Sequence, residues 1–176
     1  MARVEDYIRT IPDFPHDGIL FRDVTTLFAD PAGLALAVDQ LAGAFAQTQA
    51  EVVAGLEARG FVIGGAVAAR LGLGFVALRK AGKLPGPRIA EDYELEYGRA
   101  TLEVHDDAVE PGARVILIDD LIATGGTAVA GIRLIERLGA SVVAAGFIVD
   151  LPDLGGAEVV RRMGVPLSAL VEFAGA

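Results

Sequence analysis

Residues 114–127 read RVILIDDLIATGGT, and the organisation of the whole chain can be worked out from them. The apolar, mostly β-branched residues 115–118 lead directly into Asp119 and Asp120, and a small glycine-bearing turn then opens an apolar-periodic segment over residues 128–138. A continuous apolar run is typical of a strand buried on both faces, and the periodic segment is typical of a helix packed against it. These residues therefore predict a strand, loop and helix of a mainly parallel α/β sheet flanked by helices.

The loop of this unit has the composition of a phosphate-binding site. Residues 124–127 (TGGT) carry little side-chain bulk, so backbone N–H groups at the start of the helix can converge on an anion. The carboxylates of Asp119 and Asp120, at the carboxyl end of the strand, can accept hydrogen bonds from sugar hydroxyls or join a metal shell. No Gly-Lys-Ser/Thr follows the glycines, so the pattern favours a phosphorylated sugar over a nucleoside triphosphate. A strand that ends in two solvated aspartates and a plain glycine turn is the alternative.

Composition narrows the class of protein. The 176 residues are 53% hydrophobic with a mean hydropathy of +0.49, which predicts one domain over residues 1–176 with ample core. A formal net charge of −9 argues against a nucleic-acid partner, which would need a basic face. The N-terminal residues lack the apolar core of a signal peptide, and polar residues interrupt the apolar segments. We therefore expect a cytoplasmic protein with no membrane partner, and the lack of cysteine fits a reducing compartment.

Apolar runs and helical periodicities alternate along most of the sequence. Besides the central unit, we expect strands over residues 51–56, 75–78, 141–149 and 167–173, and helices over residues 31–47, 61–71 and 155–163. Strands that alternate with helices in this way form a mainly parallel sheet covered on both faces.

Two segments depart from this alternation. Near the N-terminus, apolar residues at helical spacing predict an amphipathic helix over residues 4–11. Residues 12–30 are rich in proline, aspartate and glycine but also carry several large apolar side chains, which predicts a hood that folds over the site. Within residues 81–105, two alternating runs joined by Gly98 and Arg99 predict a β-hairpin that acts as a lid.

Basic residues gather at two places in this acidic chain. Arg59 and Gly60 come at the turn between a strand and a helix, where a guanidinium can hold a phosphate while the backbone bends close to it. A lone surface arginine is the alternative there. Further along, four basic residues lie close together in sequence, which favours an anion site over a solvated face; they are Arg79, Lys80, Lys83 and Arg88.

VILIDDLIATGGT resembles the phosphoribosyl pyrophosphate binding motif of the type I phosphoribosyltransferases. Together with PDFPHDGILFRDVTTLFADP, GLEARGF, VALRKAGKLPGP and YELEYG, it is similar to the blocks of the adenine phosphoribosyltransferase family, in order and over nearly the full length. The resemblance implies the type I phosphoribosyltransferase fold, usually as a homodimer. It also implies purine salvage, in which adenine and phosphoribosyl pyrophosphate give AMP and pyrophosphate with Mg²⁺ as cofactor.

The resemblance also assigns roles to residues at the matched positions. The expected contacts are Asp119 and Asp120 with the ribose hydroxyls; Ala123, Thr124, Gly125, Gly126 and Thr127 with the 5′-phosphate; Arg59, Gly60, Arg79, Lys80 and Lys83 with pyrophosphate; and Leu20, Phe21 and Arg22 with adenine. In the family, part of the pyrophosphate contact crosses the dimer interface. Magnesium is expected to be held mainly by substrate oxygens, so no protein ligand to the metal is predicted.

Glu96 and Tyr97 in LEYG match the positions at which the family's lid carries its catalytic glutamate and the adjacent tyrosine. A ring nitrogen of adenine must share or lose its proton as it attacks the anomeric carbon, and a cationic sugar needs negative charge nearby. A carboxylate on a closing lid can serve both needs. An exposed hairpin carboxylate is the alternative for Glu96, and only the LEYG match selects it among the acidic residues of the hairpin.

Two other functions stay open at the level of sequence. The same reaction could act on hypoxanthine, guanine or xanthine, because backbone groups of the hood supply much of the base recognition and their geometry is not legible from sequence. A regulator that binds phosphoribosyl pyrophosphate without turnover is the other alternative. It is disfavoured because residues before Asp13 leave no room for a DNA-binding domain and the lid glutamate is present.

Overall fold

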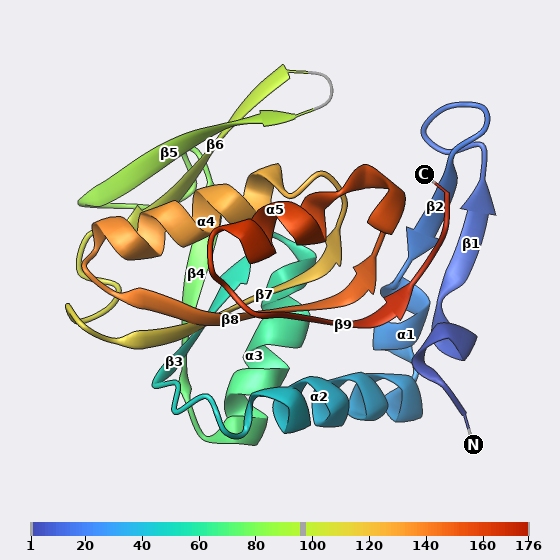
Figure 1. Ribbon diagram of the computed structural model, residues 1–176, viewed down its shortest axis with the longest axis horizontal. Helices are drawn as coiled ribbons and strands as arrows, with labels where there is room; N and C mark the ends of the chain where they lie inside the picture. The colour runs from blue at the N-terminus through green and yellow to red at the C-terminus, as the bar shows by residue number, and fades with distance from the viewer. Residues whose placement is uncertain (1, 96–97, 176) are drawn as a thin grey trace.

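A computed structural model describes residues 2–95 and 98–175, and its centre is a seven-stranded sheet (Figure 1). The strand order is β5-β6-β4-β3-β7-β8-β9. The strands are β3 (Val52–Leu56), β4 (Gly74–Lys80), β5 (Arg88–Leu95), β6 (Gly98–His105), β7 (Arg114–Ile122), β8 (Ser141–Asp150) and β9 (Leu167–Glu172). Strands β4, β3, β7, β8 and β9 run parallel, and the β5–β6 hairpin joins β4 in antiparallel orientation. The predicted mainly parallel α/β fold is confirmed.

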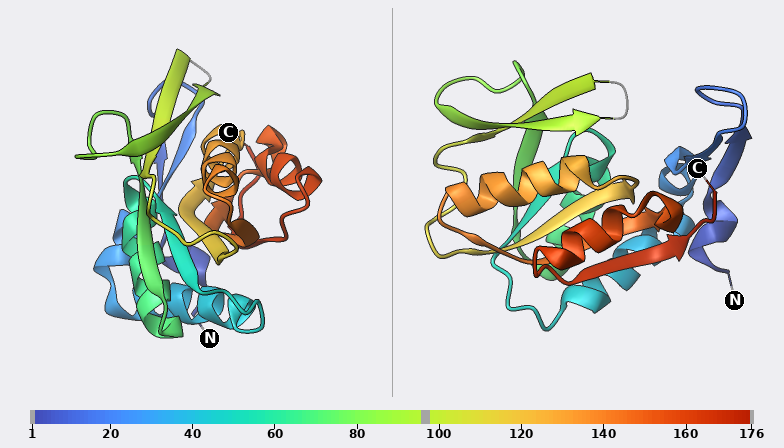
Figure 2. Two further views of the ribbon diagram at one scale, coloured as in Figure 1. Left: turned by 90° about the vertical axis from the view of Figure 1, so that its left-hand side faces the viewer. Right: turned by 45° about the horizontal axis from the view of Figure 1, so that its top comes forward.

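Helices cover both faces of the sheet, as the edge-on view in Figure 2 shows. Helices α2 (Pro31–Phe45) and α3 (Arg59–Leu71) pack on one face, and α4 (Gly126–Arg137) and α5 (Gly156–Arg162) pack on the other. The short helix α1 (Thr25–Ala29) and the 3₁₀ turns η1 (Val4–Tyr7) and η2 (Pro152–Leu154) complete the helical elements. In the described part of the chain, no helix is long and apolar enough to cross a membrane.

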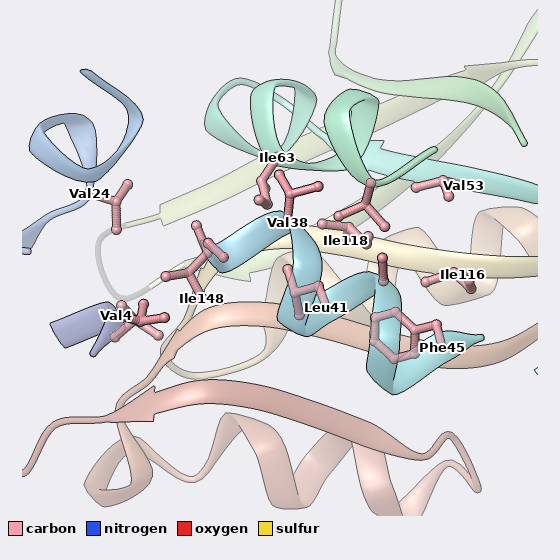
Figure 3. Packing of buried hydrophobic residues seen from close by; sticks show 14 of the residues in the cluster. Val4, Val24, Val38, Leu41, Phe45, Val53, Ile63, Ile116, Ile118 and Ile148 are labelled. Carbon is pink, nitrogen blue, oxygen red and sulfur yellow. The ribbon is translucent and has the colours of Figure 1, made fainter. Parts of the chain in front are cut away.

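The buried strand β7 explains why residues 115–118 are continuously apolar. Ile116 and Ile118 face the α2–α3 layer, where Leu41 and Phe45 of α2 lie close to them in Figure 3. Leu117 faces the α4 layer, because successive side chains of a strand point to opposite faces. Each face of β7 therefore buries apolar surface, and the ladder to β8 continues through Asp119 to Ile122, beyond the strand that the sequence predicts.

The predicted N-terminal helix over residues 4–11 is wrong. Only η1 is helical, and the chain then forms β1 (Arg9–Pro12), which pairs in antiparallel orientation with β2 (Leu20–Asp23). Cross-strand hydrogen bonds to β2 outweigh the helical spacing of the apolar residues, a tertiary effect that local pattern does not carry. The hood is therefore a small β-hairpin followed by α1, and it stands at one end of the sheet (Figure 1).

The β-hairpin predicted within residues 81–105 is present, with longer strands than its alternating runs indicate. Gly98 and Arg99, predicted as the turn, instead open β6 and pair with Leu95 and Glu94 of β5. Among the other boundaries that differ, α3 begins at Arg59 and α4 begins at Gly126, each two residues earlier than predicted. In both cases the residues expected in a loop form the first turn of the helix.

Candidate active site

The site lies at the carboxyl ends of β3 and β7, the central strands of the sheet. From β3 the chain crosses to β4 on one side, and from β7 it crosses to β8 on the other, which is the arrangement that opens a crevice in a parallel sheet. A cavity of about 480 Å³ occupies this place. Its lining combines two acidic strand ends, basic side chains and the start of α4, namely Glu57, Arg59, Lys80, Asp119, Asp120 and Thr127 among others.

An ion pair crosses the crevice. Arg59 Nε lies 2.6 Å from Asp120 Oδ2, and the Asp120 side chain is almost fully buried. The neighbouring Asp119 accepts a hydrogen bond from the Asp120 backbone N–H at 2.8 Å. Burial, and then the negative charge of Asp120, raise the pKa of Asp119 well above its usual range. The two aspartates therefore differ: Asp120 is paired with Arg59, and Asp119 holds a proton more readily than an ordinary aspartate.

Gly60 lets α3 approach β7 closely enough to form this ion pair. A Cβ atom at Gly60 would lie 2.8 Å from Asp119 Oδ1 and 2.9 Å from the Ile118 carbonyl oxygen. Carbon atoms do not approach oxygen so closely without displacement of one element. The glycine is therefore required by the packing of the first turn of α3 against the strand that carries both aspartates.

The glycine loop lines a second hollow of about 200 Å³, which shares Asp119 and Thr127 with the first cavity. Gly125 has a φ of +86°, a conformation that favours glycine, and α4 begins at the next residue. Gly126 touches the lid, because a Cβ atom there would lie 2.8 Å from the carbonyl oxygen of Glu94 on β5. The helix N-terminus, small residues and hydroxyls in this arrangement suit a phosphate group.

The hood encloses a third cavity, of about 190 Å³. Phe21 is its aromatic element and is met edge-on by Phe14, with ring centroids 5.2 Å apart. Opposite the hood, apolar side chains from the ends of β7 and β8 and from η2 close the cavity; they are Leu121, Leu151 and Leu154. Arg59 lines this cavity too, with its guanidinium carbon 5.8 Å from the Phe21 ring centroid. The third cavity therefore meets the first at Arg59.

Arg22 fastens the hood to the end of the chain. Its guanidinium carbon lies 4.2 Å from the centre of the Phe173 ring, and its Nη1 donates a hydrogen bond of 2.7 Å to the hydroxyl of Thr10 on β1. Figure 1 shows the C-terminal segment beside β2. Next to Arg22, Asp23 pairs with Arg9 and accepts two hydrogen bonds from Thr25, which lower its pKa to about 2.

The basic cluster separates into two groups in space. Arg79 and Lys83 both form ion pairs with Glu57, at 3.3 Å each, and neither lines the cavities described above. Arg88 pairs with Glu103 at 3.2 Å. Lys80, in contrast, lines the 480 Å³ cavity.

Comparison with known proteins agrees with this geometry. The family model described as the phosphoribosyl transferase domain matches residues 24–164. An adenine phosphoribosyltransferase of Dinoroseobacter shibae is 64% identical over 172 residues, which cover 98% of this chain and 96% of the relative. The chain belongs to the adenine phosphoribosyltransferase family.

Solved structures of this family share the fold. Adenine phosphoribosyltransferase of Thermoanaerobacter pseudethanolicus superposes with a TM-score of 0.91 at 42% identity, covering 97% of this chain and 98% of that one. The Saccharomyces cerevisiae enzyme, solved in complex with an imino-altritol bisphosphate and adenine, gives a TM-score of 0.88 at 37% identity, with 96% of each chain covered. The predicted type I phosphoribosyltransferase fold is confirmed by these adenine phosphoribosyltransferases.

The structure brings most of the predicted site residues of this family member together. The 480 Å³ cavity collects Arg59, Lys80, Asp119, Asp120 and Thr127, the loop hollow collects Ala123, Thr124, Gly125 and Gly126, and the hood cavity collects Leu20, Phe21 and Arg22. Gly60 packs behind Asp119, whereas Arg79 and Lys83 point to Glu57. Glu96 and Tyr97 lie outside the described residues.

Sequence reasoning missed several residues that line the cavities. Glu57 directly follows β3, just as Asp119 directly follows the apolar run of β7. An acidic residue at the carboxyl end of a parallel strand could therefore have identified Glu57 as a site residue from the sequence. Leu151 and Leu154 carried no such signal. They belong to a different part of the chain from the hood and reach its cavity only through the sheet order.

Proposed function

We propose that the chain carries out purine salvage by transferring the 5-phosphoribosyl group from phosphoribosyl pyrophosphate to adenine, with AMP and pyrophosphate as products. The observation that carries the proposal is the position of Arg59, which lines both the carboxylate-bearing cavity and the aromatic hood cavity. A base held against Phe21 and a sugar held at Asp119 and Asp120 would meet at this one side chain. Membership of the adenine phosphoribosyltransferase family supports adenine as the base.

The sugar phosphate is assigned to the glycine loop and the two aspartates. The 5′-phosphate would accept hydrogen bonds from the backbone N–H groups and hydroxyls of residues 123–127, aided by the α4 dipole. Asp119 and Asp120 would accept hydrogen bonds from the ribose hydroxyls. Because Asp120 is already paired with Arg59 and Asp119 holds a proton more readily, we expect Asp119 to donate to as well as accept from a ribose hydroxyl.

In the transfer step, the bond between the anomeric carbon and the pyrophosphate oxygen breaks, and its electron pair leaves with pyrophosphate. A ring nitrogen of adenine forms the new bond to that carbon and loses its proton. Glu96, with Tyr97 beside it, is proposed as the group that shares this proton and stabilises positive charge on the sugar. Arg59 and Lys80 would neutralise the departing pyrophosphate, and Gly60 allows Arg59 to reach the site.

Magnesium fits this site as a metal bound mainly by the substrate. Asp119 and Asp120 are hard oxygen donors at the cavity assigned to the sugar diphosphate, and magnesium typically keeps few protein ligands. When bound, it supplies positive charge that stabilises the leaving pyrophosphate. We further propose a homodimer located in the cytoplasm, as the family resemblance implies. Light scattering after size exclusion tests the oligomeric state.

The test is turnover of phosphoribosyl pyrophosphate and magnesium with adenine, hypoxanthine, guanine and xanthine in parallel. We expect only adenine to give its nucleotide. Turnover of another base instead would refute the adenine assignment, and tight phosphoribosyl pyrophosphate binding without turnover of any base would favour a regulator. A second arm compares Glu96→Ala with Glu94→Ala, a neighbouring carboxylate on β5. Only the Glu96 variant should lower kcat while it spares phosphoribosyl pyrophosphate binding.

A further inference from the structure

Glu57 is a buried carboxylate in the cavity that is assigned to a polyanion. It directly follows β3, two residues before Arg59, and its side chain is only 7% exposed. A carboxylate at this place repels pyrophosphate unless its own charge is compensated. The contacts of Glu57 are therefore informative about its role.

All of these contacts go to the end of β4 and the turn that follows. The backbone N–H of Lys80 donates to Glu57 Oε2 at 2.9 Å, and Arg79 Nε lies 3.3 Å from the same oxygen. Lys83 Nζ lies 3.3 Å from Oε1, and the Glu57 backbone N–H donates to the Leu78 carbonyl at 3.0 Å. Burial opposes the charge on Glu57, but the Lys80 amide, Arg79 and Lys83 together outweigh it and lower the pKa of this carboxyl.

The residues of the basic cluster therefore differ in their partners. Glu57 pairs with both Arg79 and Lys83, and Glu103 pairs with Arg88. Lys80 is different, because within the described residues its ammonium forms no ion pair, and the residue lines the cavity beside Arg59 and Thr127. Neighbouring residues of a strand point to opposite faces, so holding Arg79 on Glu57 also fixes the direction of the Lys80 side chain.

We propose that Glu57 is a positioning residue that ties the end of β4 to β3 and thereby presents the Lys80 ammonium to the pyrophosphate group of the substrate. The proposal rests on the proposed function, since it assigns the anion in this cavity to phosphoribosyl pyrophosphate. Within one chain, it makes Lys80 the residue of the cluster that reaches this cavity. Arg79 and Lys83 hold the segment in place through Glu57.

Simple electrostatics gives the opposite expectation, which makes the proposal easy to test. If Glu57 acted only through its charge, its neutralisation would strengthen binding of a polyanion. If Glu57 positions Lys80, the Glu57→Gln variant should bind phosphoribosyl pyrophosphate about tenfold more weakly, the scale expected for one misplaced charge-assisted hydrogen bond. The KM for adenine should stay unchanged, because the hood cavity does not contain Glu57 or Lys80.

The experiment is a double-mutant cycle with Glu57→Gln, Lys80→Met and the double variant. Turnover of the native chain with adenine is confirmed first, so failure of the proposed function is recognised separately. Calorimetry with magnesium and phosphoribosyl pyrophosphate, without adenine, then gives the dissociation constants, and steady-state kinetics gives KM and kcat. Asp39→Asn is the control, because Asp39 also pairs with an arginine, Arg70, on the exposed surface of the helical layer.

We expect Glu57→Gln to weaken binding in the native background and to change it less than about twofold in the Lys80→Met background, since the effect passes through Lys80. Equal or tighter binding by Glu57→Gln would overturn the proposal, as would an undiminished effect in the Lys80→Met background. If Glu57→Gln does not fold, Glu57→Asp takes its place in the cycle, because it keeps the charge but withdraws the carboxylate from Lys80, Arg79 and Lys83. Native affinity in Glu57→Asp, or in Lys80→Met, would then overturn the proposal.

Discussion

Replacing Gly60 by alanine should lower both stability and activity, because α3 packs closely against β7 at this residue. The added Cβ would lie 2.8 Å from Asp119 Oδ1, 2.9 Å from the Ile118 carbonyl oxygen and 3.2 Å from the Asp119 Cα. Two of these atoms belong to the backbone of β7, so relief requires the first turn of α3 to move by about 0.5 Å. Such overpacking costs about 1–3 kcal/mol. Alanine offsets up to about 1 kcal/mol of this through its better helix propensity.

Gly65→Ala is the matched control, because it lies on the same helix and an added Cβ meets nothing within 4 Å. We expect Gly65→Ala to gain up to about 1 kcal/mol in urea unfolding and Gly60→Ala to lose about 1 kcal/mol. Displacement of Arg59 should also lower kcat/KM for phosphoribosyl pyrophosphate by about 10- to 100-fold in Gly60→Ala alone. If both variants gain stability and keep native kinetics, the close approach of α3 to β7 is not what requires glycine.

Three further substitutions test other parts of the structure. Asp23→Asn should lower the free energy of unfolding by about 1–2 kcal/mol at pH 7, because folding lowers the Asp23 pKa from 3.8 to about 2. Solvent screening at the exposed Arg9 makes this loss smaller than the pKa shift alone would give. A carboxylate whose pKa is lowered by folding stabilises the native state above about pH 4, and this stabilisation is lost as the pH falls through about 2. The difference in free energy of urea unfolding between the native chain and the variant should therefore shrink below pH 4. A difference that stays constant with pH would contradict this. Gly126→Ala should lower kcat with little change in Tm, because the added Cβ would displace the Glu94 carbonyl of the β5–β6 hairpin. A native kcat in this variant would show that the close approach of Gly126 to Glu94 does not matter for turnover. Leu117→Ala should cost about 2–5 kcal/mol in urea unfolding because the side chain is fully buried, and a cost below 1 kcal/mol would contradict the tight packing of β7.

The sequence predicts the sheet and the glycine loop well because both depend on local pattern. The apolar run of β7 and the glycines after it report burial and backbone conformation directly. The extension of β7 to Ile122 was not predictable, because it depends on pairing with β8. The N-terminal helix failed for the same reason, since β2 supplies the partner that makes residues 9–12 a strand.

Within the site, residue types could be predicted but their partners could not. The sequence places Arg79, Lys80 and Lys83 in one basic cluster, yet only the structure shows that two of them turn to Glu57. The three cavities follow from the order of strands, which brings together residues distant in the chain. The catalytic assignment of Glu96 still rests on the family resemblance.

The contact between Arg22 and Phe173 joins the two ends of the chain beside the hood cavity. Arg22 precedes the segment matched by the phosphoribosyl transferase domain, and Phe173 follows it. Arg22, which lines the hood cavity, is thus held from outside the matched segment, whereas the two aspartates and the glycine loop lie within it. We therefore expect substitutions at either end of the chain to alter the hood cavity, proposed as the base site, without changing the residues assigned to the sugar phosphate.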